Sequence, residues 1–126
     1  MPLGRLSSAA LLLSGAAAVV APERVASALA LSTTSPRGLS ETRAGLGGTY
    51  AALGGWALVS SNPVAQLAVG VTWLGAAGAR LASLALDRPR TDADLWSYLA
   101  AEVGFGCLAI GTVRAHSRRQ LRGGGR

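Results

Sequence analysis

The sequence predicts an all-α protein that crosses a membrane as an up-down-up-down four-helix transmembrane bundle. Apolar residues make up 50% of the 126-residue chain and charged residues only 14%, whereas soluble domains carry about 25% charged residues. Four segments are also apolar over close to the roughly 20 residues that a membrane-spanning helix needs. We expect these helices at residues 3–21, 42–60, 64–86 and 95–113.

The first apolar segment, residues 3–21, begins beside Arg5 and stops at Pro22. It has an alternative interpretation as a secretory signal, because Arg5, an apolar core and the small residues 28–30 resemble a signal with its cleavage site. The charged pair Glu23 and Arg24 interrupts the stretch before that site and argues against cleavage. Cleavage would leave three spans, so a membrane protein is predicted in both cases.

The second segment, residues 42–60, follows a long loop, residues 22–40, whose apolar portion 25–31 we expect to form a short interfacial helix. Ser40 is the predicted N-cap of the segment, and Glu41 in its first turn favours the positive end of the helix dipole. Small residues at this density favour close packing of helices in lipid. The face predicted to pack consists of Ala44, Gly48, Ala51, Ala52 and Gly55.

The third and fourth segments each follow a helix start signal. Asn62 is the predicted cap of residues 64–86, with Pro63 in the first helical position. The connection at residues 61–63 is so short that the second and third helices must form an antiparallel hairpin. The fourth segment, 95–113, follows residues 91–94, which resemble a capping box with Asp in place of Glu.

The net charge of +6 comes from arginine, since the chain contains no lysine. The end of the chain is rich in this residue, and we predict that residues 114–126 form a basic, disordered cytoplasmic tail after a single membrane domain at 1–113. Positive charge favours the cytoplasmic side of a membrane, so both termini are expected there. No stacking aromatics accompany the tail, and nucleic acid is not an expected partner.

Two opposite charges lie inside the third and fourth apolar segments. An ionisable group in hydrocarbon is expensive, so it usually faces the bundle interior and finds a partner. Arg80 lies roughly 9 Å and Glu102 roughly 11–12 Å along their helices from the loop that joins them, at 1.5 Å per residue. Both side chains therefore reach a similar level from the same side, and an ion pair or a hydrogen-bonded neutral pair is geometrically easy. The sequence leaves open whether the two residues touch.

Further polar residues are expected on the same side of the membrane. Glu41 and Arg43 open the second segment, Tyr50 lies two turns after Arg43, and Tyr98 lies one turn before Glu102. The sequence thus predicts a candidate polar pocket, open to the non-cytoplasmic side. Its predicted members are Glu41, Arg43, Tyr50, Arg80, Tyr98 and Glu102.

Two interpretations of the charged pair stay open. In one, Arg80 and Glu102 lock two helices together, and the protein is a structural, binding or accessory membrane component. In the other, Glu102 is the proton acceptor or substrate counter-ion of a small oligomeric proton-coupled transporter. A membrane redox subunit has less support, because no ligand set for a cofactor is visible.

Other chemistry is not indicated by the sequence. No Gly-rich segment continues into the Lys-Ser/Thr of a phosphate loop, and no GxGxxG occurs. Cys107 and His116 lack the spacing of a metal site or a nucleophile set. We therefore expect no catalytic residues, no metal and no cofactor, and the sequence favours a non-enzymatic protein. The expected partners are the lipid bilayer and either further copies of the chain or another membrane protein.

Several short motifs resemble a known family. They are Ala21-Pro22-Glu23-Arg24, Glu41-x-Arg43-Ala44 before Gly47-Gly48, Arg80 late in the third segment and Glu102 in the fourth. This pattern is similar to the domain-of-unknown-function 4345 family of small four-span bacterial membrane proteins, and it covers the chain from about Leu6 to Val113. The resemblance implies a four-helix bundle in a bacterial inner membrane and carries no assigned reaction.

Overall fold

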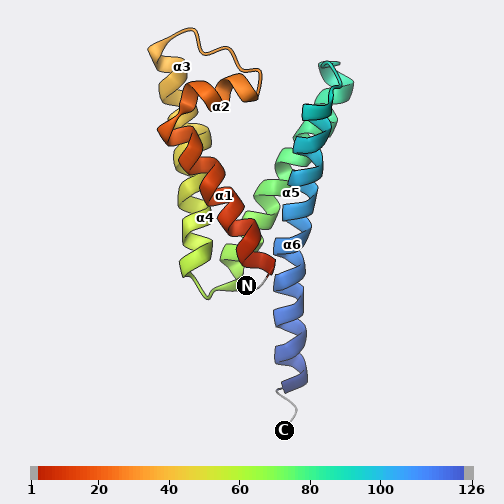
Figure 1. Ribbon diagram of the computed structural model, residues 1–126. Coiled ribbons are helices and arrows are strands. Elements are labelled where there is room, and N and C mark those ends of the chain that lie inside the picture. The colour runs from red at the N-terminus through yellow and green to blue at the C-terminus, as the bar shows by residue number, and fades with distance from the viewer. Residues whose placement is uncertain (1–2, 124–126) are drawn as a thin grey trace. The chain divides into compact units, whose positions relative to one another are not determined.

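The computed structural model describes residues 3–123, and within this range the chain forms helices and no strand (Figure 1). The prediction of an all-α protein is confirmed. The elements in order are α1 (Leu3–Val20), α2 (Pro22–Ala28), α3 (Pro36–Glu41), the π-helix η1 (Thr42–Gly48), α4 (Thr49–Val59), α5 (Pro63–Leu86) and α6 (Ala93–Gly123).

Three helical segments in the described range are long and apolar enough to cross a membrane: Leu3–Val20, Pro63–Leu86 and Ala93–Arg118. They agree with the first, third and fourth predicted spans. The predicted second span, residues 42–60, is not among them, because a π-helical turn precedes α4 and leaves that α-helix only 11 residues long.

The chain divides into two compact units, Ser8–Ser60 in one and Met1–Ser7 with Ser61–Arg126 in the other. Helix α1 therefore contributes its first residues to one unit and the rest of its length to the other. The single domain expected over residues 1–113 stays a prediction.

Within the Ser8–Ser60 unit, α1 and α4 approach so closely that only glycine fits at the contact. A Cβ at Gly54 would lie 2.7 Å from the carbonyl oxygen of Ser8, and one at Gly15 would lie 2.7 Å from that of Gly47. The predicted packing face on Gly48 and Gly55 is wrong, because a Cβ at either position would meet nothing closer than 3.8 Å. Two neighbouring faces of the helix over residues 42–60 consist of small residues. Residue size alone therefore did not show which of the two faces packs against α1.

The helical run that ends in α4 begins earlier than predicted. Ser35 is its N-cap and accepts a hydrogen bond from the Gly38 amide at 3.1 Å, with Pro36 in the first turn. The predicted cap Ser40 therefore lies inside α3. The Ser-Pro pair is the stronger start signal, since the fixed φ of proline suits the first helical position. The expected helix in the preceding loop is present as α2, which starts at Pro22 rather than at residue 25.

The other long helix, α6, ends later than predicted. It continues through Gly123, whereas the sequence predicted the end of the helix at residue 113 and a disordered tail after it. Residues 114–122 contain neither Gly nor Pro and include arginine, alanine, glutamine and leucine, which are good helix formers. The sequence between Arg114 and Arg122 therefore contains no helix-breaking residue that would end α6 before Gly123.

The connections around α5 place the third and fourth predicted spans side by side and antiparallel (Figure 1). Asn62 caps α5 as predicted, accepting from the Val64 amide at 2.9 Å. Asp92 caps α6, accepting from the Leu95 amide at 3.0 Å. The predicted capping region is thus confirmed, with Asp92 as the residue whose side chain makes the cap.

Candidate functional site

The buried face of α5 leads directly to Arg80. Its buried residues recur every turn, at Ala65, Val69, Trp73 and Ala77, and Arg80 is three residues further along the same face. On α6 the matching buried face starts at Glu102 and continues to Gly106 and Ala109. The helical repeat therefore brings both charged side chains to the contact between the two helices.

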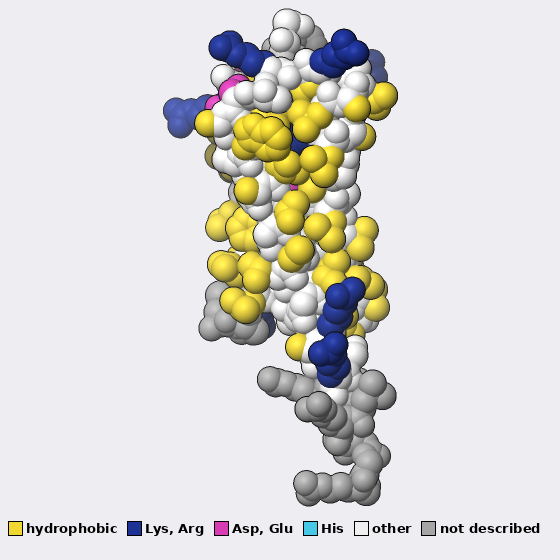
Figure 2. Space-filling model, turned by 90° about the vertical axis from the view of Figure 1, so that its right-hand side faces the viewer, with side chains coloured by type: hydrophobic (Ala, Val, Ile, Leu, Met, Phe, Trp, Pro, Cys, Tyr) yellow, Lys and Arg dark blue, Asp and Glu magenta, His cyan; other side chains and the backbone are white. Residues whose placement is uncertain are grey.

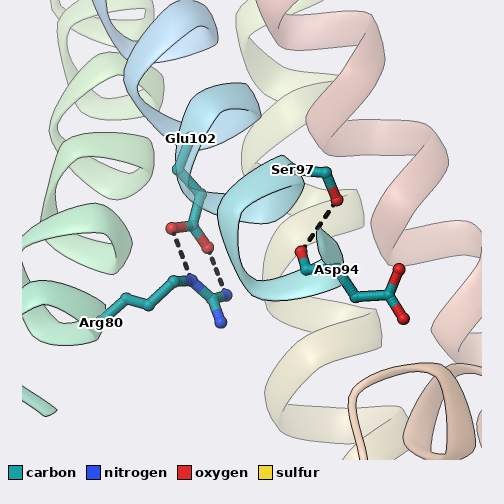
Figure 3. A network of polar contacts seen from close by, with 4 residues as sticks. All are labelled: Arg80, Asp94, Ser97 and Glu102. Carbon is teal, nitrogen blue, oxygen red and sulfur yellow. Dashed lines mark hydrogen bonds and ion pairs between the residues drawn. The ribbon is translucent and has the colours of Figure 1, made fainter. Parts of the chain in front are cut away.

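Arg80 and Glu102 form a bidentate ion pair (Figure 3). The Arg80 Nε donates to Glu102 Oε2 at 3.0 Å, and a terminal guanidinium nitrogen donates to Oε1 at 2.7 Å. This parallel arrangement is the strong geometry of an arginine–carboxylate pair. The Glu102 side chain is only 9% exposed, and that of Arg80 is 28% exposed. The structure thus shows that the two residues are in contact, which the sequence left open.

Tyr98 completes this group from one turn earlier on α6. The guanidinium carbon of Arg80 lies 5.5 Å from the centre of the Tyr98 ring, which is within the range of a cation–π contact. Nearby, Ser97 donates to the Asp94 carbonyl at 2.8 Å, and the Asp94 carboxylate points away from the ion pair (Figure 3). Glu102 is thus the carboxylate that neutralises Arg80.

Further from the α5–α6 loop than the ion pair, the contact between α5 and α6 is apolar and tight. The rings of Trp73 and Phe105 lie 5.4 Å apart between centroids. A Cβ at Gly70 or Gly106 would lie 3.3 Å from the carbonyl oxygen of the other residue, so the two backbones meet directly. Arg80 and Glu102 are therefore adjacent to a closely packed contact between the two helices.

Ser7 belongs to this contact, and sequence reasoning missed it. Its buried hydroxyl donates to the Phe105 carbonyl at 2.8 Å, while its own carbonyl accepts from Trp73 Nε1 at 3.5 Å. The sequence feature that could have indicated this contact is the pair of serines, Ser7 and Ser8, inside an otherwise apolar segment. A polar group in such a segment usually bonds to a neighbouring helix.

The six predicted pocket residues fall into two sets. Arg80, Tyr98 and Glu102 contact one another in one unit, whereas Glu41, Arg43 and Tyr50 belong to the other. A single pocket of six residues stays a prediction.

Two residues of the second set have local roles. Arg43 donates from its guanidinium to the Val19 carbonyl at the end of α1. Glu41 lies 3.7 Å from Arg37 in an exposed pair one turn apart on α3. The Arg43 contact lies at the end of α1, whereas the exposed Arg37–Glu41 pair contributes little.

The described residues hold no group of three His, Cys, Asp or Glu side chains that could bind a metal ion. They also contain no buried side-chain nitrogen or oxygen without a hydrogen-bond partner. The polar contact that the structure shows between α5 and α6 is the Arg80–Glu102 ion pair.

Comparison with known proteins identifies the family of the chain. The sequence matches the family described as Domain of unknown function (DUF4345) over residues 3–112. The chain belongs to this family. The match covers α1 to most of α6, including Arg80 and Glu102, and confirms the resemblance seen in the sequence motifs. No curated protein and no solved structure matches the chain.

Proposed function

We propose that this DUF4345 protein is an integral membrane protein of the bacterial inner membrane, in which the ion pair is architectural. In this proposal it crosses the bilayer four times with both termini in the cytoplasm, and it acts as a structural, binding or accessory component. The observation that carries the proposal is the bidentate Arg80–Glu102 pair between two helices that are apolar enough to span a membrane.

The electrostatics support this role. A single charged side chain at the centre of a spanning helix costs about 2.5–3.5 kcal/mol on insertion scales. Pairing removes the net charge, and the fork geometry uses both carboxylate oxygens of Glu102. The pair can form only when α5 and α6 have the correct register and orientation, so it selects one arrangement of the hairpin.

The same geometry disfavours the transporter interpretation. A carrier needs a carboxylate that can exchange its proton or a substrate, whereas both oxygens of Glu102 are bonded to Arg80. The side chain is also almost fully buried. A transport cycle would first have to break the strongest polar contact between α5 and α6.

A binding role is supported by glycines that the fold leaves uncovered. A Cβ at Gly75, Gly78 or Gly104 would meet nothing within 4 Å, in contrast to the tightly packed Gly70 and Gly106. Small residues on a lipid-facing surface allow another helix to approach closely. A second copy of the chain or a different membrane protein fits such a surface.

Two experiments on the full chain test the proposal. Membranes washed with alkaline carbonate are expected to retain the protein, and a photo-crosslinking residue at Gly104 is expected to give a discrete adduct. Recovery of the protein in the soluble fraction would contradict the membrane location. A proton-uptake assay in proteoliposomes tests the transporter interpretation. Uptake that is lost in Glu102→Gln but kept in the control Asp94→Asn would support a transporter instead.

A further inference from the structure

A groove runs along α6 near the start of α1, further from the α5–α6 loop than the ion pair. It has a volume of about 530 Å³. Its lining residues are Leu3, Cys107, Leu108, Gly111, Thr112, Ala115 and His116. All of them belong to the same compact unit.

The lining is mostly apolar or small. Gly111 has nothing within 4 Å of its Cβ position, so the absence of a side chain there leaves space open. Thr112 directs its hydroxyl to the Leu108 carbonyl of its own helix, at 2.9 Å. Apart from His116 at one end, the groove therefore presents surface suited to a hydrocarbon chain.

Arginine side chains follow the groove along the same helix. Arg114 lies two turns beyond Cys107, and Arg118 lies two turns beyond Gly111, so both lie along the edge of the groove that Cys107 and Gly111 form. Both are exposed. Figure 2, which looks onto the α5–α6 side, shows hydrophobic side chains along the helices with arginines above and below them.

The two ends of the α5–α6 pair differ in their acidic residues. Arg88 and Arg90 at the connecting loop are accompanied by Asp87, Asp92 and Asp94. At the groove end, by contrast, the sequence after Glu102 contains no Asp or Glu. Only the groove end therefore carries a strong net positive charge.

We propose that this groove binds an anionic phospholipid, with an acyl chain along Leu3, Leu108 and Gly111 and the headgroup phosphate at Arg114 and Arg118. The proposal rests on the membrane location proposed above. The groove occupies the last apolar part of α6, and the arginines follow where the helix becomes polar, which matches the order of acyl chain and phosphate in a lipid. Because α6 stays helical through this region, the arginines are held on a fixed surface.

Binding is tested on the purified full chain in a mild detergent, by native mass spectrometry with phosphatidylglycerol or phosphatidylcholine. The wild type is expected to prefer phosphatidylglycerol. An arginine near a lipid surface changes affinity by about fivefold, so Arg114→Gln with Arg118→Gln is expected to weaken phosphatidylglycerol binding about 25-fold. Phosphatidylcholine binding is expected to fall by less, because the choline cation offsets the charge of its phosphate, so the preference for phosphatidylglycerol is lost. The matched control, Arg88→Gln with Arg90→Gln, keeps the preference.

A second pair of variants tests the groove itself. A Cβ at Gly111 would meet nothing within 4 Å, so Gly111→Leu is expected to fill the open space and to weaken binding of both lipids. Gly45→Leu, at an equally open position outside the groove, leaves both unchanged. Circular dichroism confirms that each variant is folded. Equal affinity of the wild type for the two lipids, or a preference that survives the Arg114→Gln, Arg118→Gln change, would overturn the proposal. If lipid binding fails these tests while the protein still stays in carbonate-washed membranes, the lipid site is wrong and the proposed membrane location still stands.

Discussion

Arg80 and Glu102 share two parallel hydrogen bonds, at 3.0 and 2.7 Å, across the contact between α5 and α6. The two residues lie at similar distances from the loop that joins the helices. Arg80 lies within two turns of the end of α5 at Leu86, and Glu102 lies between two and three turns after the start of α6 at Ala93. This relationship turns two costly charges into a neutral connection. It also explains why a segment that is otherwise apolar contains a carboxylate.

The fork geometry predicts that lysine does not replace arginine at this position. Lysine keeps the charge but presents a single ammonium group, so it cannot donate in parallel to both oxygens of Glu102 or stack on Tyr98. We expect Arg80→Lys to lower the free energy of unfolding by about 1–2 kcal/mol, as measured by thermal unfolding in detergent. The control Arg90→Lys is at an exposed site. Equal stability of Arg80→Lys and the wild type would show that the bidentate contact is dispensable.

The α1–α4 contact predicts that glycine-to-alanine changes have position-dependent effects. At Gly15 and Gly54 the added Cβ would collide with backbone atoms of the neighbouring helix, which cannot rotate away. Each change is expected to destabilise the protein by about 1–3 kcal/mol. The control Gly45→Ala meets nothing within 4 Å and is expected to be neutral or slightly stabilising. Similar melting temperatures for all three variants would contradict the tight contact.

The start of α6 gives a test that separates two adjacent residues. The Asp92 side chain accepts from the Leu95 amide, so Asp92→Ala is expected to cost about 1 kcal/mol. Thr91→Ala, one residue earlier and exposed, is expected to have little effect on the same unfolding measurement. The reverse order of the two effects would mean that the helix starts one residue earlier than the structure shows.

The end of α1 predicts a smaller effect at Arg43. Helix α1 has no basic residue in its last turn, and the Arg43 guanidinium binds the Val19 carbonyl there. A cation at a helix C-terminus contributes about 0.3–1 kcal/mol, so we expect Arg43→Gln to cost an amount in that range. Arg37→Gln, whose partner Glu41 is exposed, serves as the control. A larger loss for Arg37→Gln would contradict this role of Arg43.

The sequence predicted the helical class, most helix positions and the similar level of Arg80 and Glu102 on neighbouring helices, because these depend on local patterns. Apolar length locates helices, Asn62 and Asp92 mark their starts, and a buried charge requires a partner. The face of α4 that packs on α1 could not be derived, since neighbouring stripes both consist of small residues. The hydrogen bond from Ser7 to Phe105 joins residues far apart in the chain, and no local pattern specifies such a partner.

The most direct test of the architectural role is a double-mutant cycle on the purified protein, with Arg80→Met, Glu102→Gln and the combination. Arg80→Met leaves the buried carboxylate of Glu102 without its partner, so we expect a loss of about 3 kcal/mol in the free energy of unfolding. Glu102→Gln is expected to cost less, because the Arg80 side chain is partly exposed. The combined change is expected to recover about 1–3 kcal/mol of the summed losses. Losses that simply add, or variants as stable as the wild type, would contradict the account of Arg80 and Glu102 as a lock between α5 and α6.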